Sequence, residues 1–345
     1  MNIREYSLDE LKLKLQELDE KPFRAIQIYE WLHKHMTCSL DEASNLSKEL
    51  KLKLNESFDV SFPRIEKEYV SKIDETKKYL IRLTDDYIIE SVLMKYKYGY
   101  TVCVSSEVGC NMGCKFCAST VNGMKRNLYA HEILAQIYLI AKHNNIKISN
   151  IVIMGMGEPL LNLDNVIRFL NIINDENGQK ISLRNITLST CGIVENIYKL
   201  ASYNLPITLA LSLHAPNDEI RKRLMPIANK YKLNDVMEAM AQYFEKTNRK
   251  ITCEYTLIDG INSNICEAKE LKQLFDKYFT KKHIDYNVNL IAVNEINETS
   301  FKAPSRAKVL AFRDYLLNCG VQVMIRRELG KDISGSCGQL RMSVK

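Results

Sequence analysis

The sequence Cys110-Asn-Met-Gly-Cys114-Lys-Phe-Cys117 is the starting point, because three cysteines at CxxxCxxC spacing can close around one inorganic centre. The loop follows directly after a β-type run at residues 101–105. A tetrahedral zinc site needs a fourth Cys or His, and the nearest histidine, His131, lies beyond a basic loop. An iron–sulfur cluster held by three thiolates leaves one iron without a protein ligand, so a substrate or cofactor can bind there. The spacing therefore favours an iron–sulfur cluster held by these three cysteines.

The composition is that of a globular enzyme. The chain has 345 residues, of which 46% are hydrophobic and 26% charged. No run approaches the length of a membrane span and the first residues show no apolar signal region, so we expect a cytoplasmic protein. Ten cysteines in such a chain indicate metal or catalytic use rather than disulfides. The formal net charge of +6 permits a polyanionic partner but does not require one.

Residues 1–55 predict a small helical accessory domain. Ser7-Leu-Asp-Glu10 has the pattern of a capping box at the start of a first helix. Pro22 suits the first turn of a second helix, and a third helix is expected over about 40–54.

Residues 56–98 predict a short antiparallel β extension that leads into the main domain. Its β-like runs lie at 60–62, 79–83 and 87–94. The following segment, Lys95-Tyr-Lys-Tyr-Gly-Tyr100, interleaves cations with aromatic rings. This composition suits phosphates and unstacked bases, and it equally suits a strand edge guarded by lysines.

Strand and helix patterns alternate over the remaining residues, 99–345. The β-rich runs lie at 101–105, 150–155, 185–190, 207–213, 251–257 and 286–293, with a further one at 321–326. The helical patterns lie at about 130–144, 164–174, 194–203, 233–246, 265–279 and 305–318. Such alternation predicts parallel strands joined by right-handed helical crossovers. Six main units are too few for a closed eight-fold barrel, so the predicted fold is α/β, a partial, open (β/α)6 barrel.

The CxxxCxxC spacing, with Phe116 before the last cysteine, resembles the cluster loop of the radical S-adenosylmethionine (SAM) enzymes. In that superfamily SAM binds the open iron, and an electron from the cluster cleaves it to a 5′-deoxyadenosyl radical. Reactive groups of such barrels gather where the strands end. The polar and glycine residues at the predicted strand ends suit the amino, carboxylate, ribose and adenine groups of SAM. These candidate cofactor contacts are Gly157, Glu158, Ser189, Ser212, Leu213, His214 and Asn294.

Further motifs resemble the RlmN branch of the RlmN/Cfr family of radical-SAM RNA methyltransferases. They are Val104-Ser-Ser-Glu-Val-Gly-Cys110, Cys114-Lys-Phe-Cys-Ala-Ser-Thr120, Met124-Lys-Arg-Asn-Leu128, Gly155-Met-Gly-Glu-Pro-Leu160, Leu211-Ser-Leu-His-Ala-Pro-Asn-Asp218, Arg223-Leu-Met-Pro-Ile227, Ile325-Arg-Arg-Glu-Leu-Gly-Lys-Asp332 and Cys337-Gly-Gln-Leu-Arg341. Phe23-Arg-Ala-Ile-Gln-Ile-Tyr-Glu-Trp31 is also similar to the family's N-terminal helical domain. The likeness covers nearly the whole chain.

The resemblance implies methylation at C2 of adenosine 2503 in 23S rRNA and of adenosine 37 in tRNAs, with two SAM molecules per turnover. Adenine C2 is electron-poor, so direct polar methyl transfer does not work there. In the family, one SAM methylates a cysteine, matched here by Cys337, and a radical from the second removes a hydrogen from that methyl group. The resulting thiomethylene radical adds to the base. Glu90 matches the base that takes the proton from the adduct, and Cys103 matches the thiol that releases the RNA by forming a disulfide.

Two other activities remain open on the sequence. Cfr-type methylation at C8 of the same rRNA adenosine is one, and a radical-SAM enzyme that modifies a peptide or activates another enzyme is the other. The chain departs from the family pattern at Glu107, where Gln is usual, and at Cys191, where Val is common.

The expected partners are 23S rRNA before ribosome assembly is complete, tRNA, a flavodoxin- or ferredoxin-type electron donor and a thiol reductant. The cations available for RNA are Lys125-Arg126, Arg221-Lys-Arg223, Arg249-Lys250, Lys281-Lys282, Arg326-Arg327 and Arg341.

Overall fold

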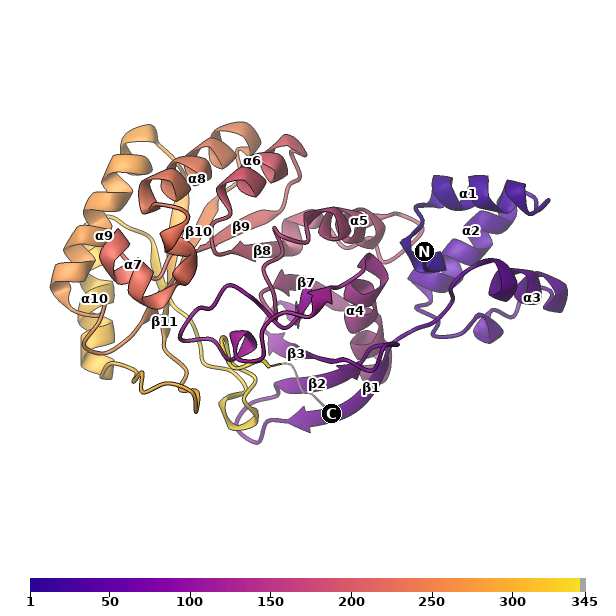
Figure 1. Ribbon diagram of the computed structural model, residues 1–345, viewed down its shortest axis with the longest axis horizontal. Helices are drawn as coiled ribbons and strands as arrows, with labels where there is room; N and C mark the ends of the chain where they lie inside the picture. Colours follow the sequence, from indigo (N-terminus) through magenta and orange to yellow (C-terminus); the bar gives the residue numbers. More distant parts are fainter. Residues whose placement is uncertain (342–345) are drawn as a thin grey trace.

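The computed structural model describes residues 1–341, and its centre is one curved β-sheet wrapped on the outside by helices (Figure 1). Over these residues the sheet contains, in spatial order, β1 (Arg64–Val70), β2 (Lys77–Arg82), β3 (Ile88–Tyr96), β4 (Gly99–Val104), β7 (Ile148–Ile153), β8 (Ile186–Thr190), β9 (Thr208–Ser212), β10 (Ile251–Leu257), β11 (Tyr286–Ala292) and β12 (Val323–Ile325). Neighbours from β1 to β4 pair antiparallel, and neighbours from β4 to β12 pair parallel. A separate two-stranded sheet consists of β5 (Glu107–Val108) and β6 (Arg126–Asn127).

The helices fall into two groups. The N-terminal group is α1 (Leu8–Glu17), α2 (Phe23–Tyr29) and α3 (Lys48–Ser57). The second group lies between the parallel strands and comprises α4 (Ala130–Asn144), α5 (Leu163–Asn174), α6 (Val194–Ser202), α7 (Asp218–Leu224), α8 (Leu233–Thr247), α9 (Ile265–Tyr278) and α10 (Arg306–Asn318). The six units from β4 to β11 confirm the predicted partial (β/α)6 barrel, and β12 adds one more parallel strand.

Two local predictions near the N-terminus are wrong. The third helix begins at Lys48 and not near residue 40, because Ser47 caps it by accepting a hydrogen bond from Leu50 N. Residues 60–62 lie outside every strand, and β1 begins only after Pro63. The short helix α7 is absent from the predicted helices.

The predicted division into 1–55, 56–98 and 99–345 stays a prediction. The sheet itself is continuous across 98 and 99, since β3 and β4 form a hairpin around a two-residue turn. The predicted antiparallel extension is thus hydrogen-bonded to the barrel as part of the same sheet.

The parallel strands bring distant residues together at one edge of the sheet. Every residue of β10 is buried, as expected for a strand covered on both faces. Because parallel strands share a direction, the segments that follow β4, β7, β8, β9 and β11 all emerge at the same edge. That edge carries the cysteine loop and the predicted cofactor contacts.

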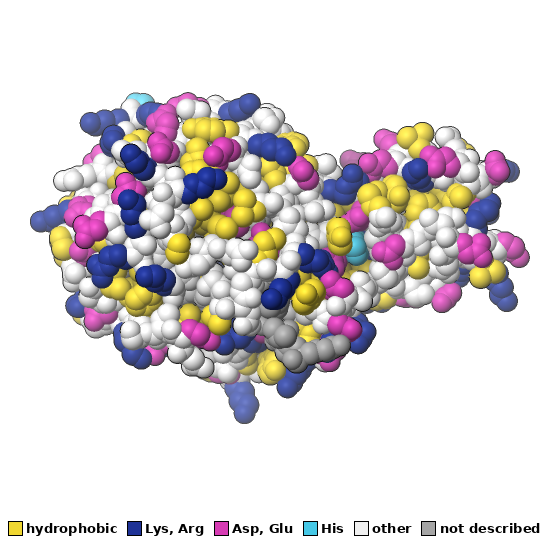
Figure 2. Space-filling view, viewed as in Figure 1, with side chains coloured by type: hydrophobic (Ala, Val, Ile, Leu, Met, Phe, Trp, Pro, Cys, Tyr) yellow, Lys and Arg dark blue, Asp and Glu magenta, His cyan; other side chains and the backbone are white. Residues whose placement is uncertain are grey.

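The N-terminal helices form a lobe beside the barrel (Figure 1), and a waist separates the two on the molecular surface (Figure 2). Buried polar contacts join them. His131 Nδ1 on α4 lies 2.9 Å from Glu5 Oε1, and Arg168 on α5 donates to the Glu5 carbonyl oxygen at 2.7 Å. His33 Nδ1 lies 3.0 Å from the hydroxyl of Tyr138. Among residues 1–341 no helix is both long and apolar enough to cross a membrane.

The Glu5 carboxylate makes the joint between lobe and barrel sensitive to pH. Burial raises its pKa, but the hydrogen bond with His131 and the charge of Arg168 outweigh burial, and the pKa lies below its ordinary value. A lowered pKa in the folded state stabilises the fold above the unfolded pKa of about 4.3. This stabilisation is lost as the pH falls through the folded pKa.

Glu5→Gln is therefore expected to lower the free energy of unfolding at pH 7 by about 1–3 kcal/mol, because it removes a charged partner from a buried hydrogen bond. The difference from the unaltered protein should shrink as the pH falls below about 4. Urea unfolding of both proteins at pH 7 and at a pH below about 4 measures this difference in the free energy of unfolding. Glu17→Gln, which alters an exposed carboxylate paired with Lys14, is the matched control. An equal loss at both pH values would contradict the assignment.

Candidate active site

The cysteine loop is closed by backbone pairing on both sides. Val108 of β5 pairs with Arg126 of β6, so the chain leaves and re-enters at one point. Gly109 at the start has a φ of +79°, and a Cβ there would lie 1.9 Å from the Gly123 carbonyl oxygen, so only glycine fits. Lys115 N donates to the Leu224 carbonyl, which ties the loop to α7.

Cys110, Cys114 and Cys117 line one cavity of about 150 Å³. Burial raises the pKa of the Cys110 thiol to about 12, and it also raises the pKa values of the Cys114 and Cys117 thiols. Such thiols stay protonated unless a metal takes the place of the protons. Over residues 1–341 no group of three or more His, Cys, Asp or Glu side chains is arranged to hold a single metal ion. A cluster of several iron atoms spaces its thiolates further apart than one ion does.

A buried arginine beside the loop supports an anionic occupant. Arg221 is fully buried, and its Nε and Nη1 have no hydrogen-bond partner, while Nη2 donates to the Cys191 carbonyl at 2.6 Å. Its charge opposes the rise in the pKa of the Cys114 thiol. Three buried thiols facing one cavity, with an unpaired guanidinium next to them, fit an iron–sulfur cluster with thiolate ligands. Arg221 was among the cations expected at the RNA surface, and its burial rules that out.

The predicted cofactor contacts gather around the same cavity, with one exception. Those that line it are Gly157, Glu158, Ser189, Ser212, His214 and Asn294. Leu213 is buried without lining it, and its N–H donates to the Glu254 carbonyl.

Hydrogen bonds to both carboxylate oxygens hold Glu158 within the Gly155–Leu160 turn. Its Oε2 accepts from Cys191 N at 2.7 Å and its Oε1 from Leu160 N at 3.1 Å. Each carboxylate oxygen has a second lone pair, so the group can still accept from a ligand. Burial raises its pKa.

His214 follows β9 and has a φ of +55°, which turns it toward the cysteine loop. Its Nδ1 accepts from Thr256 N at 3.0 Å, so the neutral ring carries its proton on Nε2. Burial and the Arg221 charge lower the His214 pKa to about 3, which keeps the ring neutral. Phe116 packs edge-on against it at 4.8 Å. His214 can thus donate, but not accept, a hydrogen bond at Nε2.

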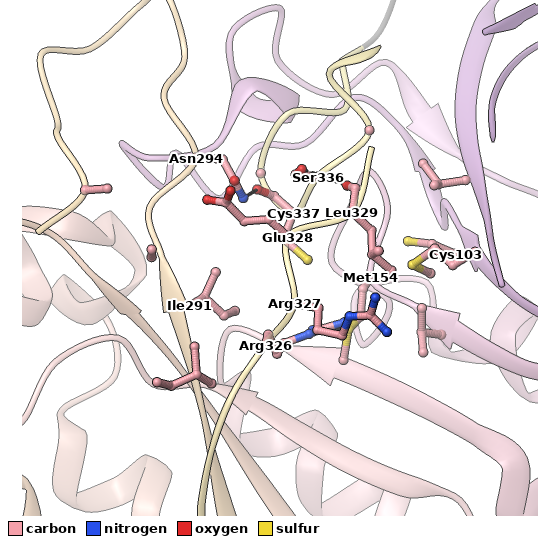
Figure 3. A pocket seen from close by; sticks show the side chains of 18 of the residues that line it. Cys103, Met154, Ile291, Asn294, Arg326, Arg327, Glu328, Leu329, Ser336 and Cys337 are labelled. Carbon is pink, nitrogen blue, oxygen red and sulfur yellow. Dashed lines mark hydrogen bonds between the residues drawn. The ribbon is translucent and has the colours of Figure 1, made fainter. Parts of the chain in front are cut away.

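Cys103 and Cys337 line a second cavity of about 670 Å³ (Figure 3). They are 234 positions apart in the chain, since 337 − 103 = 234. Cys103 is buried on β4, and Cys337 is exposed on the segment after β12. Cys337 also lines the cavity of the three cluster cysteines, and Cys117 likewise lines both cavities.

Hydrogen bonds hold the C-terminal segment over the cysteine loop. Asn294 Nδ2 donates to the Cys337 carbonyl at 2.9 Å, and Ala118 N donates to the Gly338 carbonyl at 2.7 Å. Ser119 Oγ donates to the Leu340 carbonyl at 2.6 Å. These bonds keep Cys337 next to the loop that ends at Cys117.

Arg326 lies close to both thiols, a position that the sequence did not indicate. It lines both cavities, and its Nη1 approaches Glu254 Oε2 at 3.5 Å. The charge of a Cys337 thiolate raises the Arg326 pKa, and Cys103 adds to this effect. Burial raises the pKa of the Cys103 thiol to about 12, and Arg326 opposes that rise. The guanidinium therefore favours the thiolate form of Cys103.

Glu90 lies beside the second cavity and does not line it. It is on β3 two residues before Val92, which does line the cavity, so both point to the same face. Its Oε1 pairs with Lys78 Nζ at 3.3 Å, and its Oε2 accepts from Arg341 N at 3.1 Å. Burial raises the Glu90 pKa, and Lys78 opposes the rise. Lys78 was not predicted. It pairs with Val92 in the β2–β3 register and so lies diagonally across from Glu90.

Glu107 is a buried carboxyl without a hydrogen-bond partner on either oxygen. Burial raises its pKa to about 7. A Cβ at Gly157 would lie 2.6 Å from its Cβ and Cγ, so it packs behind the Gly155–Leu160 turn. Glu107, which stands where the family usually has Gln, is thus a buried side chain next to the predicted cofactor contacts.

Replacing one cluster cysteine gives a direct test of the metal assignment. Cys114→Ala, reconstituted with iron and sulfide without oxygen, is expected to lose most of its bound iron and sulfide, because two thiolates cannot hold the cluster. Iron and sulfide analysis measures this. Cys266→Ala, which removes an exposed thiol on α9, is the matched control and should bind as much iron as the unaltered protein. Equal iron in both variants would exclude Cys114 as a ligand.

Comparisons with known proteins agree with this geometry. Residues 104–273 match the radical SAM superfamily, and residues 1–60 match the ribosomal RNA large subunit methyltransferase N-terminal domain. A probable dual-specificity RNA methyltransferase RlmN of Clostridium novyi is 49% identical over 340 residues, covering 99% of this chain and 97% of that protein. Its counterpart in Lachnospira eligens is 48% identical, with 99% and 95% covered. The crystal structure of a radical SAM methyltransferase from Sphaerobacter thermophilus superposes with a TM-score of 0.93 at 36% identity, covering 99% of both chains. The chain belongs to the RlmN family of radical-SAM dual-specificity RNA methyltransferases.

Proposed function

We propose that this protein methylates C2 of adenosine 2503 in 23S rRNA and of adenosine 37 in tRNAs. The relatives named dual-specificity RNA methyltransferases support an RNA substrate. The observation that carries the proposal is the position of Cys337, which borders the cavity of the cluster cysteines on one side and the cavity of Cys103 on the other. A methyl carrier that must meet first a cofactor and then a base needs such a position.

The residues fit a [4Fe-4S] cluster on Cys110, Cys114 and Cys117, with SAM at Gly157, Glu158, Ser189, Ser212, His214 and Asn294. When bound, this pair supplies an electrophilic methyl group from one SAM and a hydrogen-abstracting radical from a second. Leu213 stays a prediction that depends on its backbone, because its side chain does not line the cavity.

Cys337 is proposed to act as the methyl carrier. Its thiolate is the nucleophile for ordinary displacement, and the Arg326 side chain lines the same two cavities as Cys337. Loss of one hydrogen from the S-methyl group leaves a carbon radical on Cys337, and this radical adds to adenine C2. The Asn294 hydrogen bond to the Cys337 carbonyl positions the carrier during both events.

Glu90 and Cys103 are proposed to complete the reaction. Glu90 takes the proton from the substituted C2, and the one unpaired electron of the adduct would return to the oxidised cluster, which leaves a closed-shell thioether. Lys78 opposes the rise that burial causes in the Glu90 pKa. Cys103 then attacks the Cys337 sulfur, a disulfide forms, and the carbon leaves with the electron pair of the broken S–C bond to become the methyl group after protonation. A thiol reductant must reduce the disulfide before the next turnover. A flavodoxin- or ferredoxin-type protein is proposed as the electron donor.

The proposed roles of Cys337 and Cys103 predict two different products that can be detected separately. Peptide mass analysis of protein made with the cluster loop intact is expected to find an S-methyl group on Cys337, and this group should be absent when Cys114 is replaced. Cys103→Ala is expected to accumulate protein crosslinked to RNA, because nothing releases the adduct. Cys319→Ala, a change at the end of α10, is the control and should accumulate none. Turnover with unmodified Cys337, or a Cys103→Ala variant without crosslink, contradicts the mechanism.

The proposed base predicts a pH profile with a definite direction. The rate rises as Glu90 loses its proton, so the profile's acidic midpoint follows the Glu90 pKa, which burial raises above its ordinary value. Lys78→Met removes the opposing charge and should move this midpoint to higher pH. Glu90→Gln should slow methyl product formation by about 100-fold or more.

Single-turnover methylation of an RNA hairpin across pH measures both effects. Lys77→Met, a change to the neighbouring residue on β2 that pairs with Glu68, is the matched control. A midpoint that stays in place in Lys78→Met would show that Glu90 is not the titrating group.

A further inference from the structure

Two stacked tyrosines lie where the β3–β4 hairpin meets the second cavity. The rings of Tyr96 and Tyr98 are 5.0 Å apart between centroids and almost parallel, with an interplanar angle of 5°. Tyr96 lines the cavity that holds Cys103 and Cys337. Tyr98 is 66% exposed, so its ring has one face on Tyr96 and leaves the other open to solvent.

The hairpin turn holds this pair rigidly. Tyr96 pairs with Gly99 across a turn formed by Lys97 and Tyr98. Gly99 has a φ of +123°, and a Cβ there would lie 2.2 Å from Ser149 Oγ, so the turn packs tightly against the start of β7. β3 pairs with β2 and β4, and β4 pairs with β3 and β7, so the segment is not a sheet edge. The interpretation of its lysines as guards of an edge strand is therefore wrong.

The cavity next to the tyrosines carries cations without partners. Arg306 at the start of α10 and Arg327 after β12 line the cavity and are exposed. Among residues 1–341 neither side chain makes a hydrogen bond or an ion pair. Lys97 in the turn is likewise exposed and unpaired within this part of the chain, whereas Lys95 pairs with Glu75 at 2.8 Å. Many other surface cations are paired, as Lys250 is with Asp285 and Lys282 with Glu238.

We propose that Tyr98, supported by Tyr96, stacks an unpaired nucleobase adjacent to the target adenosine, while Arg306 and Arg327 bind the phosphates around it. This inference rests on the proposed function and adds the contacts that position the RNA strand. Every base offers a π-face to an aromatic ring, and a preformed exposed ring binds it at little cost in conformational entropy. A guanidinium without a partner suits a phosphate oxygen.

The structure explains why these residues serve a ligand and not the fold. Tyr98 buries only a third of its side chain, so it adds little to the core. The guanidinium groups of Arg306 and Arg327 form no hydrogen bond or ion pair within residues 1–341, so they do not join the described elements to one another. An aromatic platform and free cations around one cavity are the combination by which proteins hold single-stranded nucleic acid.

The test measures binding directly. The probe is a synthetic RNA hairpin whose loop holds the target adenosine with the fluorescent base 2-aminopurine beside it, on the 5′ side in one RNA and on the 3′ side in another. Binding of the reconstituted protein is expected to quench one of the two probes, because a stacked 2-aminopurine loses its fluorescence. Tyr98→Phe should keep the quenching, and Tyr98→Ala should lose it and bind about 10-fold more weakly.

Tyr203→Ala is the matched control, because it removes a tyrosine of 41% exposure outside both cavities. It should quench and bind as the unaltered protein does. Equal quenching and affinity in Tyr98→Ala would overturn the platform, as would quenching of neither probe by bound protein.

Methyl transfer to an unlabelled hairpin, measured by mass analysis, separates this inference from the proposed function. If the unaltered protein methylates the hairpin and Tyr98→Ala quenches and binds as well as it does, the stacking role of Tyr98 is excluded and the proposed function stands. If the unaltered protein does not methylate the hairpin, the proposed function is excluded. A loss of quenching in Tyr98→Ala would in that case still identify Tyr98 as a nucleobase contact.

Discussion

The hydrogen bonds between the cysteine loop and the C-terminal segment are the interactions on which the site depends. Ala118 N to the Gly338 carbonyl and Ser119 Oγ to the Leu340 carbonyl join parts of the chain that are over 200 residues apart. Gly338 has a φ of +82°, and a Cβ there would lie 3.0 Å from the Phe116 carbonyl oxygen, so a larger residue would push the segment away. Without this close approach Cys337 would border neither cavity.

Burial of charge is the second constraint on the site. Arg221, Glu107 and the three cluster cysteines lie in a region with little water, where an isolated charge is costly. Their pKa values shift in the directions that favour neutral groups. A bound anionic cluster would give the buried Arg221 guanidinium a partner of opposite charge.

The order of strands and helices was predictable because hydrophobic runs and amphipathic periods alternate along the chain. The cysteine spacing predicted which residues share the first cavity. Contacts between side chains on neighbouring strands were not predictable. Arg326 lies near both thiols because β12 pairs with β11. Lys78 pairs with Glu90 because of the β2–β3 register. The burial of Arg221 was not predictable either, because an arginine followed by Lys222 and Arg223 resembles part of an exposed basic surface.

Residues 334–341, which carry Cys337, form no helix or strand, and hydrogen bonds to side chains and loop backbone hold them in place. These bonds are separate from the strand pairing of the sheet, so loop contacts and not a strand set the position of Cys337. Cys337 therefore lines both cavities, whereas Cys103, fixed on β4, lines only the second.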